Sequence, residues 1–167
     1  MSNKHQNQLN SRVIVNRKYA EKVVKRFAYA ISRSSQPELS ATLTSNLFEE
    51  NGKFCNPARC VTGKQNIKNN FLDYLNLQGE KDQFLQINDI IWDQEKLSGS
   101  VLATWGGTVI IKDFVPGVAA GQSYTQDDIH FFRLNEEGKV TLWIESFNPS
   151  QTSAFICPSK KALCCRS

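Results

Sequence analysis

The sequence has no run of eighteen apolar residues, and no basic stretch followed by a short apolar core near Met1. A membrane-spanning helix and a secretory signal peptide are therefore not expected, and a cytoplasmic protein is predicted. Zinc-type Cys-x-x-Cys spacing is also missing, and the only histidines are His5 and His130. We expect neither a metal nor a cofactor.

Cysteines are few and odd in number, and the sequence predicts that they are reduced thiols. In the last eleven residues, two lysines precede the vicinal pair Cys164 and Cys165, which resembles a lipidation tail. Arg166 departs from the aliphatic residue that such tails prefer. A loose tail with idle thiols is favoured over contact with a membrane. The five cysteines are Cys55, Cys60, Cys157, Cys164 and Cys165.

The net charge of +4 is unevenly distributed. Residues 1–36 hold eight lysines and arginines against one acid, whereas residues 37–156 hold nine against fifteen. A basic segment can bind nucleic acid or an acidic membrane surface. This one lacks the interleaved aromatic residues of a nucleic-acid platform, so a solvated helix face is favoured and nucleic acid is not an expected partner.

The first half of the chain is predicted to be mainly helical. Residues 1–15 are polar and predict a flexible arm, and apolar residues at helical spacing then predict an amphipathic helix over 16–31. Pro37 begins a second, short helix that continues to Leu47. A strand with a break is expected over 47–56, and a third helix runs from Gly63 to near Gly79.

The second half reads as four strands, at 84–93, 97–112, 123–134 and 139–148. Helices followed by strands predict an α+β domain, with a curved, mostly antiparallel sheet wrapped around about three helices. Gly106 and Gly107 predict a bulge or bend in the longest strand. The expected organisation is an arm at 1–15, one domain at 16–150 and a tail at 151–167.

Three motifs carry a resemblance to a known family: 54–57 followed by Thr62-Gly63-Lys64, the strand 130–134, and the ending from Gly138 to Pro149. Over residues 16–150 the chain resembles the nuclear transport factor 2-like superfamily, especially its SnoaL-like branch. The resemblance implies a cone with a central apolar pocket. It also implies a homodimer through the outer sheet face, for which Trp105, Phe131 and Trp143 are candidates. The apolar loop 113–121 is expected to cover a ligand, pair with another subunit, or fold over the cone mouth.

Candidate catalytic residues follow from strand alternation, which places Asp128, His130 and Phe132 on one face. A histidine with a pKa near neutrality in an apolar cone is suited to acid/base catalysis, with Asp128 as its modulator. Glu145, between two aromatic residues, is the second polar candidate. The alternatives are a hydrogen-bonded core histidine and a solvent-facing glutamate.

The resemblance also suggests which residues line the pocket. Two functions stay open: a cofactor-free isomerase, cyclase or dehydratase acting on a small hydrophobic molecule, and a noncatalytic ligand-binding or interaction module. The acid expected for epoxide opening is missing, since Leu102 and Thr104 lie near the positions of the family's arginine and aspartate. The ligand-binding candidates are Tyr29, Phe54, Asn56, Tyr74, Phe132, Trp143 and Phe147.

Overall fold

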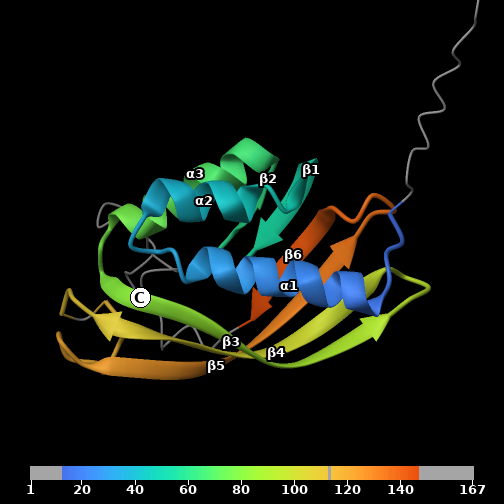
Figure 1. Cartoon of the computed structure of the whole chain (residues 1–167). Helices are drawn as coiled ribbons and strands as arrows, with labels where there is room; N and C mark the ends of the chain where they lie inside the picture. The colour runs from blue at the N-terminus through green and yellow to red at the C-terminus, as the bar shows by residue number, and fades with distance from the viewer. Residues whose placement is uncertain (1–12, 113, 147–167) are drawn as a thin grey trace, which may run out of the picture.

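The computed structural model describes residues 13–112 and 114–146 (Figure 1). The predicted arm and tail, including three of the five cysteines, fall largely outside these residues, so the domain limits stay predictions. The elements are α1 (Arg17–Ile31), α2 (Pro37–Ser45), β1 (Phe48–Cys55), β2 (Cys60–Thr62), α3 (Lys64–Asn76), β3 (Glu80–Asp93), β4 (Ser98–Val109), β5 (Ser123–Leu134) and β6 (Val140–Ser146).

The strands form one sheet in the order β2-β1-β6-β5-β4-β3. β1 and β6 pair in parallel, and the other neighbouring strands pair antiparallel. The three helices lie on one side of this curved sheet, and α1 crosses it next to β3 (Figure 1). The predicted α+β fold with a mostly antiparallel, curved sheet is confirmed.

Helix α1 forms where the apolar spacing predicts it. The Asn16 side chain caps its start by accepting a hydrogen bond from the backbone N–H of Tyr19. One stripe of the helix is buried, whereas Lys18, Lys25 and Arg26 are exposed. The basic segment within α1 is therefore the solvated face of a core helix, as expected. The buried residues are Ala20, Val23, Val24, Phe27, Ala30 and Ile31.

Several predicted boundaries were wrong by a few residues. Helix α2 ends at Ser45 and α3 at Asn76, and β3 begins at Glu80, which is earlier than expected. The three-residue strand β2 was not predicted, because so short a segment carries no periodicity. The expected break in β1 is a register shift against β6 between Phe48 and Lys53, not an interruption.

The two glycines of β4 do not form the predicted bulge, because β4 stays in continuous register with β5 through Gly106 and Gly107. The irregularity lies on the opposite strand, between Lys81 and Phe84 of β3. A Cβ atom on Gly106 would lie 2.4 Å from the Phe84 ring. Only glycine at this position therefore allows the ring to pack against the outer face of the strand.

Cys55 and Cys60 form a disulfide across the β1–β2 hairpin, so the prediction that these two are reduced thiols was wrong. The antiparallel register places them opposite each other, which residue spacing alone did not show. Disulfides are rare in a reducing cytosol. The bond therefore weighs against the cytoplasmic location, which stays a prediction.

The outer face of the sheet differs from the expectation. Trp105 and Trp143 are fully buried on the inner face, because the pleat places them beside the core residues Val101 and Phe132, so the prediction that they supply dimer contacts was wrong. Phe131 does lie on the outer face and is partly buried. No helix among the described residues is long and apolar enough to cross a membrane.

Candidate functional site

His130 lies at the centre of the inner sheet face and is fully buried. Its Nδ1 atom accepts a hydrogen bond of 3.1 Å from the Trp143 indole N–H. The Phe27 ring of α1 and the Trp143 ring both meet the imidazole edge-on, with centroids 6.0 and 5.8 Å away. These contacts fix the orientation of the imidazole ring.

The protonation of His130 follows from these contacts. Because Nδ1 accepts a hydrogen bond from the Trp143 indole N–H, the imidazole proton lies on Nε2, and Nε2 has no hydrogen-bond partner among the described residues. Burial lowers the pKa of His130 to about 3. The expected pKa near neutrality does not fit this environment, and the ring is a neutral donor at physiological pH.

Asp128 shares the inner face with His130, as strand alternation predicted, and Glu145 of β6 lies on the same face. Glu145 is the register partner of His130, and its Oε1 atom lies 3.9 Å from His130 Nδ1. Burial, and secondarily the charge of Asp128, raises the pKa of Glu145 well above its ordinary value. The ionised form of Glu145 is therefore disfavoured, and because His130 is neutral the contact between them is not an ion pair.

Asp128 is the buried acid whose titration falls near neutral pH. Burial raises its pKa from an ordinary 3.8 to about 7, opposed by a hydrogen bond from Gln126 and increased by the charge of Asp127. The Gln126 amide donates at 3.1 Å. On the neighbouring strand the register partner of Asp128 is Ala103, which is also buried. A base of this pKa is half ionised at pH 7.

A second polar cluster, which the sequence reasoning missed, lies nearby. The hydroxyl groups of Tyr74 and Tyr124 each donate a hydrogen bond to the buried carboxyl group of Glu80. Burial raises the pKa of Glu80, while these two hydrogen bonds lower it. The charge of Glu145 acts on the pKa of Tyr74 and that of Asp128 on the pKa of Tyr124, so the two clusters share one electrostatic environment.

The other predicted pocket residues divide into three groups. Phe54, Phe132 and Trp143 are buried in the aromatic core, and Tyr74 binds Glu80. Phe147 lies outside the described residues.

Two predicted pocket residues, Tyr29 and Asn56, have other structural roles. Tyr29 is 51% exposed and carries Arg33 on its ring, because it lies off the buried stripe of α1, so its assignment to the pocket was wrong. Asn56 is buried, but its Oδ1 atom accepts from the backbone N–H groups of Ala58 and Arg59. That oxygen closes the β1–β2 turn, so it is not available to a ligand.

The predicted apolar loop folds onto the core. Phe114 and Val115 are buried, and the Phe114 ring lies 6.0 Å from that of Tyr74. A Cβ atom on Gly79 would overlap the Phe114 ring, so this glycine makes room for the loop. Of the three alternatives for this loop, the burial of Phe114 and Val115 favours the one in which it folds over the mouth of the cone.

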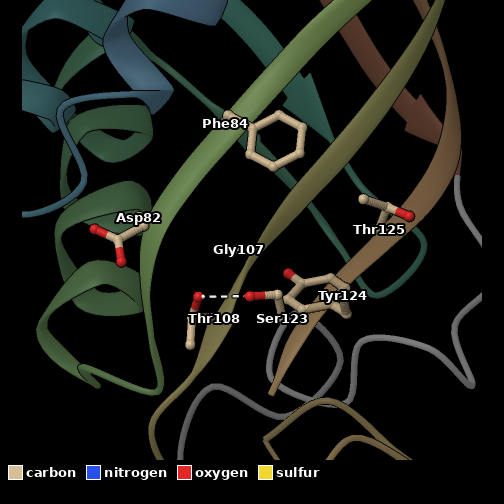
Figure 2. Close-up of a pocket in the computed structure, with 7 residues that line it drawn as sticks. All are labelled: Asp82, Phe84, Gly107, Thr108, Ser123, Tyr124 and Thr125. Carbon is tan, nitrogen blue, oxygen red and sulfur yellow. Dashed lines mark hydrogen bonds between the residues drawn. The ribbon is translucent and has the colours of Figure 1, made fainter. Parts of the chain in front are cut away.

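A groove of about 380 Å³ lies over the ends of β3, β4 and β5 (Figure 2). The exposed ring of Phe84 forms one side, and Thr108 and Ser123, which hydrogen-bond each other at 3.1 Å, form another. It is separate from the buried acids, and Tyr124 connects the two regions. Asp82, Gly107 and Thr125 complete its lining.

The described residues hold no group of three or more potential metal ligands. Among the described residues, the inner face offers a buried acid that titrates near neutrality, a second acid whose pKa is raised well above its ordinary value, and an imidazole N–H without a hydrogen-bond partner. These groups are suited to moving a proton and to stabilising a developing oxyanion.

Neither a protein-family model nor a curated protein sequence matches the chain. Among solved structures it is similar to the epoxide hydrolase/cyclase-like enzyme SalBIII, with a TM-score of 0.63 and 11% identity over 83% of this chain and 97% of that one. A protein with a ketosteroid isomerase-like fold from Catenulispora acidiphila, solved in complex with trimethylamine, has a TM-score of 0.61 and 15% identity over 80% and 90% of the two chains. A candidate polyketide cyclase from Xanthomonas campestris has a TM-score of 0.61 and 18% identity over 79% and 92%. At these identities the likeness concerns the fold, and the chain has the nuclear transport factor 2-like fold of SnoaL-like and ketosteroid isomerase-like proteins.

Proposed function

We propose that this protein binds a small molecule inside the cone and catalyses a cofactor-free proton transfer, as an isomerase, cyclase or dehydratase. The observation that carries the proposal is the burial of Asp128, His130 and Glu145 together on the inner face, where burial raises the pKa of Asp128 to about 7 and that of Glu145 well above its ordinary value. Two acids whose environments separate their protonation states are suited to the roles of base and acid.

Asp128 is the proposed base. Its carboxylate removes a proton from a carbon next to a carbonyl group, and the electron pair moves onto the carbonyl oxygen. Returning the proton to a different carbon completes an isomerisation without a net change in atoms or charge. Because His130 has a pKa of about 3, the role of base moves from His130 to Asp128.

Glu145 and His130 are the proposed donors. The protonated carboxyl group of Glu145 and the Nε2–H of His130 stabilise the developing oxyanion by hydrogen bonding. Glu145 Oε1 and His130 Nε2 are both buried without a hydrogen-bond partner among residues 13–112 and 114–146, which leaves each free to bind such an oxygen.

The proposal is tested by deuterium uptake. A panel of small ketones, including β,γ-unsaturated ones, is incubated with the protein in D₂O, and exchange at carbons next to the carbonyl group is followed by proton NMR. We expect exchange that requires Asp128 and that slows below about pH 7, because the base becomes protonated there. Asp128→Asn should reduce the rate at least about a hundredfold. The control is Asp73→Asn, the same change at an exposed position on α3. If Asp128→Asn catalysed exchange as fast as Asp73→Asn, the proposal would be contradicted.

The alternative function, a noncatalytic interaction module, is favoured by the outer sheet face. Ile91, Leu102 and Ile129 are 63%, 42% and 53% exposed there, on β3, β4 and β5. Adjacent exposed apolar residues mark an interaction surface. We propose a second copy of the chain as the partner, because the outer stripe of β5 is self-complementary.

That self-complementarity comes from the order of residues on β5. Exposed Asp127 and Arg133 lie about 20 Å apart at the two ends of the stripe, with Ile129 and Phe131 between them. A two-fold axis through the apolar centre places Asp127 of each copy against Arg133 of the other. Apolar contacts at the centre and opposite charges at the rim suit a homodimer.

Light scattering after gel filtration tests this dimer. Ile129→Asp should give a monomer, because it places a charge at the apolar centre of the interface, whereas Leu39→Asp, on the exposed side of α2, should not. Arg133→Asp should weaken the dimer at least tenfold, and adding Asp127→Arg should restore it, because the charges again oppose each other. A monomeric wild type at 100 μM or below, or the same mass for every variant, would contradict the proposal.

A further inference from the structure

The groove over the ends of β3, β4 and β5 is a second candidate site, which the proposed function does not use (Figure 2). On β5, Ser123 and Thr125 are exposed and alternate with residues that face the core, such as Gln126, so they belong to the outer face of the sheet. The volume of about 380 Å³ lies within the range of small-molecule pockets. The groove is therefore large enough to hold a small molecule outside the cone.

An exposed aromatic ring forms one side of this groove. Phe84 is 39% exposed, whereas its neighbours Gln83 and Leu85 are buried, so the ring is what this part of β3 presents to solvent. The Cζ and Cε1 atoms of the ring lie over Gly106, where a Cβ atom would be 2.4 and 2.5 Å away from them. The glycine thus fixes the place of the ring, and the rest of the ring is left as a stacking surface for a ligand.

Hydroxyl groups form another side of the groove. Thr108 of β4 and Ser123 of β5 are register partners, and their hydroxyl oxygens hydrogen-bond each other at 3.1 Å. Because a hydroxyl group can donate one hydrogen bond and accept two, the pair keeps a donor and several acceptor positions after this contact. Thr125, exposed on the same face of β5, adds a third hydroxyl group. This side of the groove can therefore both donate to a ligand and accept from it.

The charge of the lining disfavours several classes of ligand. Among the described residues, the lining includes no lysine or arginine, so the phosphate of a nucleotide would find no cationic partner. Asp82 is the one charged residue of this lining, and its carboxylate points away from the Phe84 ring, so the two are not placed to hold one organic cation (Figure 2). A wholly apolar ligand would separate the hydroxyl groups from water without replacing their hydrogen bonds. The lining favours a neutral molecule that has both an apolar face and hydrogen-bonding groups.

We propose that this groove binds a neutral carbohydrate, a mono- or disaccharide, with one sugar ring stacked on Phe84. A pyranose ring presents C–H groups on its face and hydroxyl groups around its rim. The C–H groups carry a small positive charge, which the negative face of an aromatic ring attracts. The rim hydroxyl groups then exchange hydrogen bonds with Thr108, Ser123 and Thr125. Because the site lies outside the cone, binding here does not depend on Asp128 or on the proposed catalysis.

The test is an NMR titration of the full chain with cellobiose, lactose and maltose. The backbone amide signals of Gly106 and Gly107 are the reporters, because Gly106 lies under the Phe84 ring and Gly107 lines the groove. We expect at least one of the three sugars to bind with a Kd of about 5 mM or tighter.

Three variants assign the binding to the groove. Phe84→Leu keeps an apolar side chain but removes the ring, so it should weaken binding at least about fivefold. Phe84→Tyr keeps the ring and should stay within about twofold of the wild type. Thr108→Val removes one hydroxyl group with little change of shape and should weaken binding about fivefold.

The matched control is Ile91→Ala, a change at another exposed apolar residue of β3 that does not line the groove, and it should bind the sugar like the wild type. Adenosine is the control ligand, because its base also stacks on aromatic rings, and it should bind more weakly than the best sugar. Tighter binding of adenosine, or equal binding of the sugar by Phe84→Leu and the wild type, would overturn the inference. So would reporter signals that respond to none of the three sugars at about 20 mM. The proposed function is decided separately, by deuterium exchange on ketones.

Discussion

Asp128→Asn should make the protein more stable than the wild type at pH 8, by as much as about 4 kcal/mol, and leave it unchanged near pH 4. Burial raises the pKa of Asp128 from 3.8 to about 7. Between these pH values the folded state keeps a proton that the unfolded state has lost. The wild type therefore loses the stability due to this group as pH rises from 4 to 7, and no further above 7. Asparagine does not titrate, and its side-chain oxygen can still accept the hydrogen bond from Gln126.

The comparison between variant and wild type is needed because His130 has the opposite effect. Its pKa is lowered from 6.5 to about 3, so it stabilises the folded state as pH rises from 3 to 6.5 and hides the contribution of Asp128 in the wild-type curve. Urea unfolding at pH 4, 6 and 8 gives the difference directly. Asp73→Asn, on the exposed side of α3, should stay within 0.5 kcal/mol of the wild type, as is usual for the surface. A variant less stable than the wild type at pH 8 would show that Asp128 is stabilising and not strained.

The order of elements was predictable because periodicity survives in the sequence. Strand β5 occupies the predicted range 123–134, and its alternation placed Asp128 and His130 on one face. The pairing of segments that are distant in the sequence could not be predicted in the same way. The parallel contact of β1 with β6 and the disulfide between Cys55 and Cys60 both depend on tertiary register, which local patterns do not encode.

The candidate site was predictable in position but not in chemistry. The alternation of residues around His130 predicts an interior location, yet the pKa of His130 depends on how completely the surrounding side chains exclude water. The hydrogen bond from Trp143 adds a second constraint, because it fixes which nitrogen carries the proton. Glu80 was missed because it lies at the start of β3 in a charged segment, Glu80-Lys81-Asp82, that resembles a solvated turn. What distinguishes Glu80 from a residue of a solvated turn is its hydrogen bonds with Tyr74 of α3 and Tyr124 of β5, which the sequence does not reveal.

Glu80→Leu should destabilise the protein by roughly 3 kcal/mol, since it leaves the buried hydroxyl group of Tyr74 and the half-buried one of Tyr124 without their acceptor. Glu80→Gln should cost less, because the amide oxygen still accepts one hydrogen bond. The measurement is the free energy of unfolding in urea.

A double-mutant comparison separates the hydrogen bonds from simple loss of packing. In a Tyr74→Phe and Tyr124→Phe background, Glu80→Leu should cost at least 1 kcal/mol less than it does alone, because no buried donor is then left unpaired. An equal cost in both backgrounds would assign the effect to packing around Gly107, whose Cβ position lies 3.1 Å from the Glu80 carboxylate.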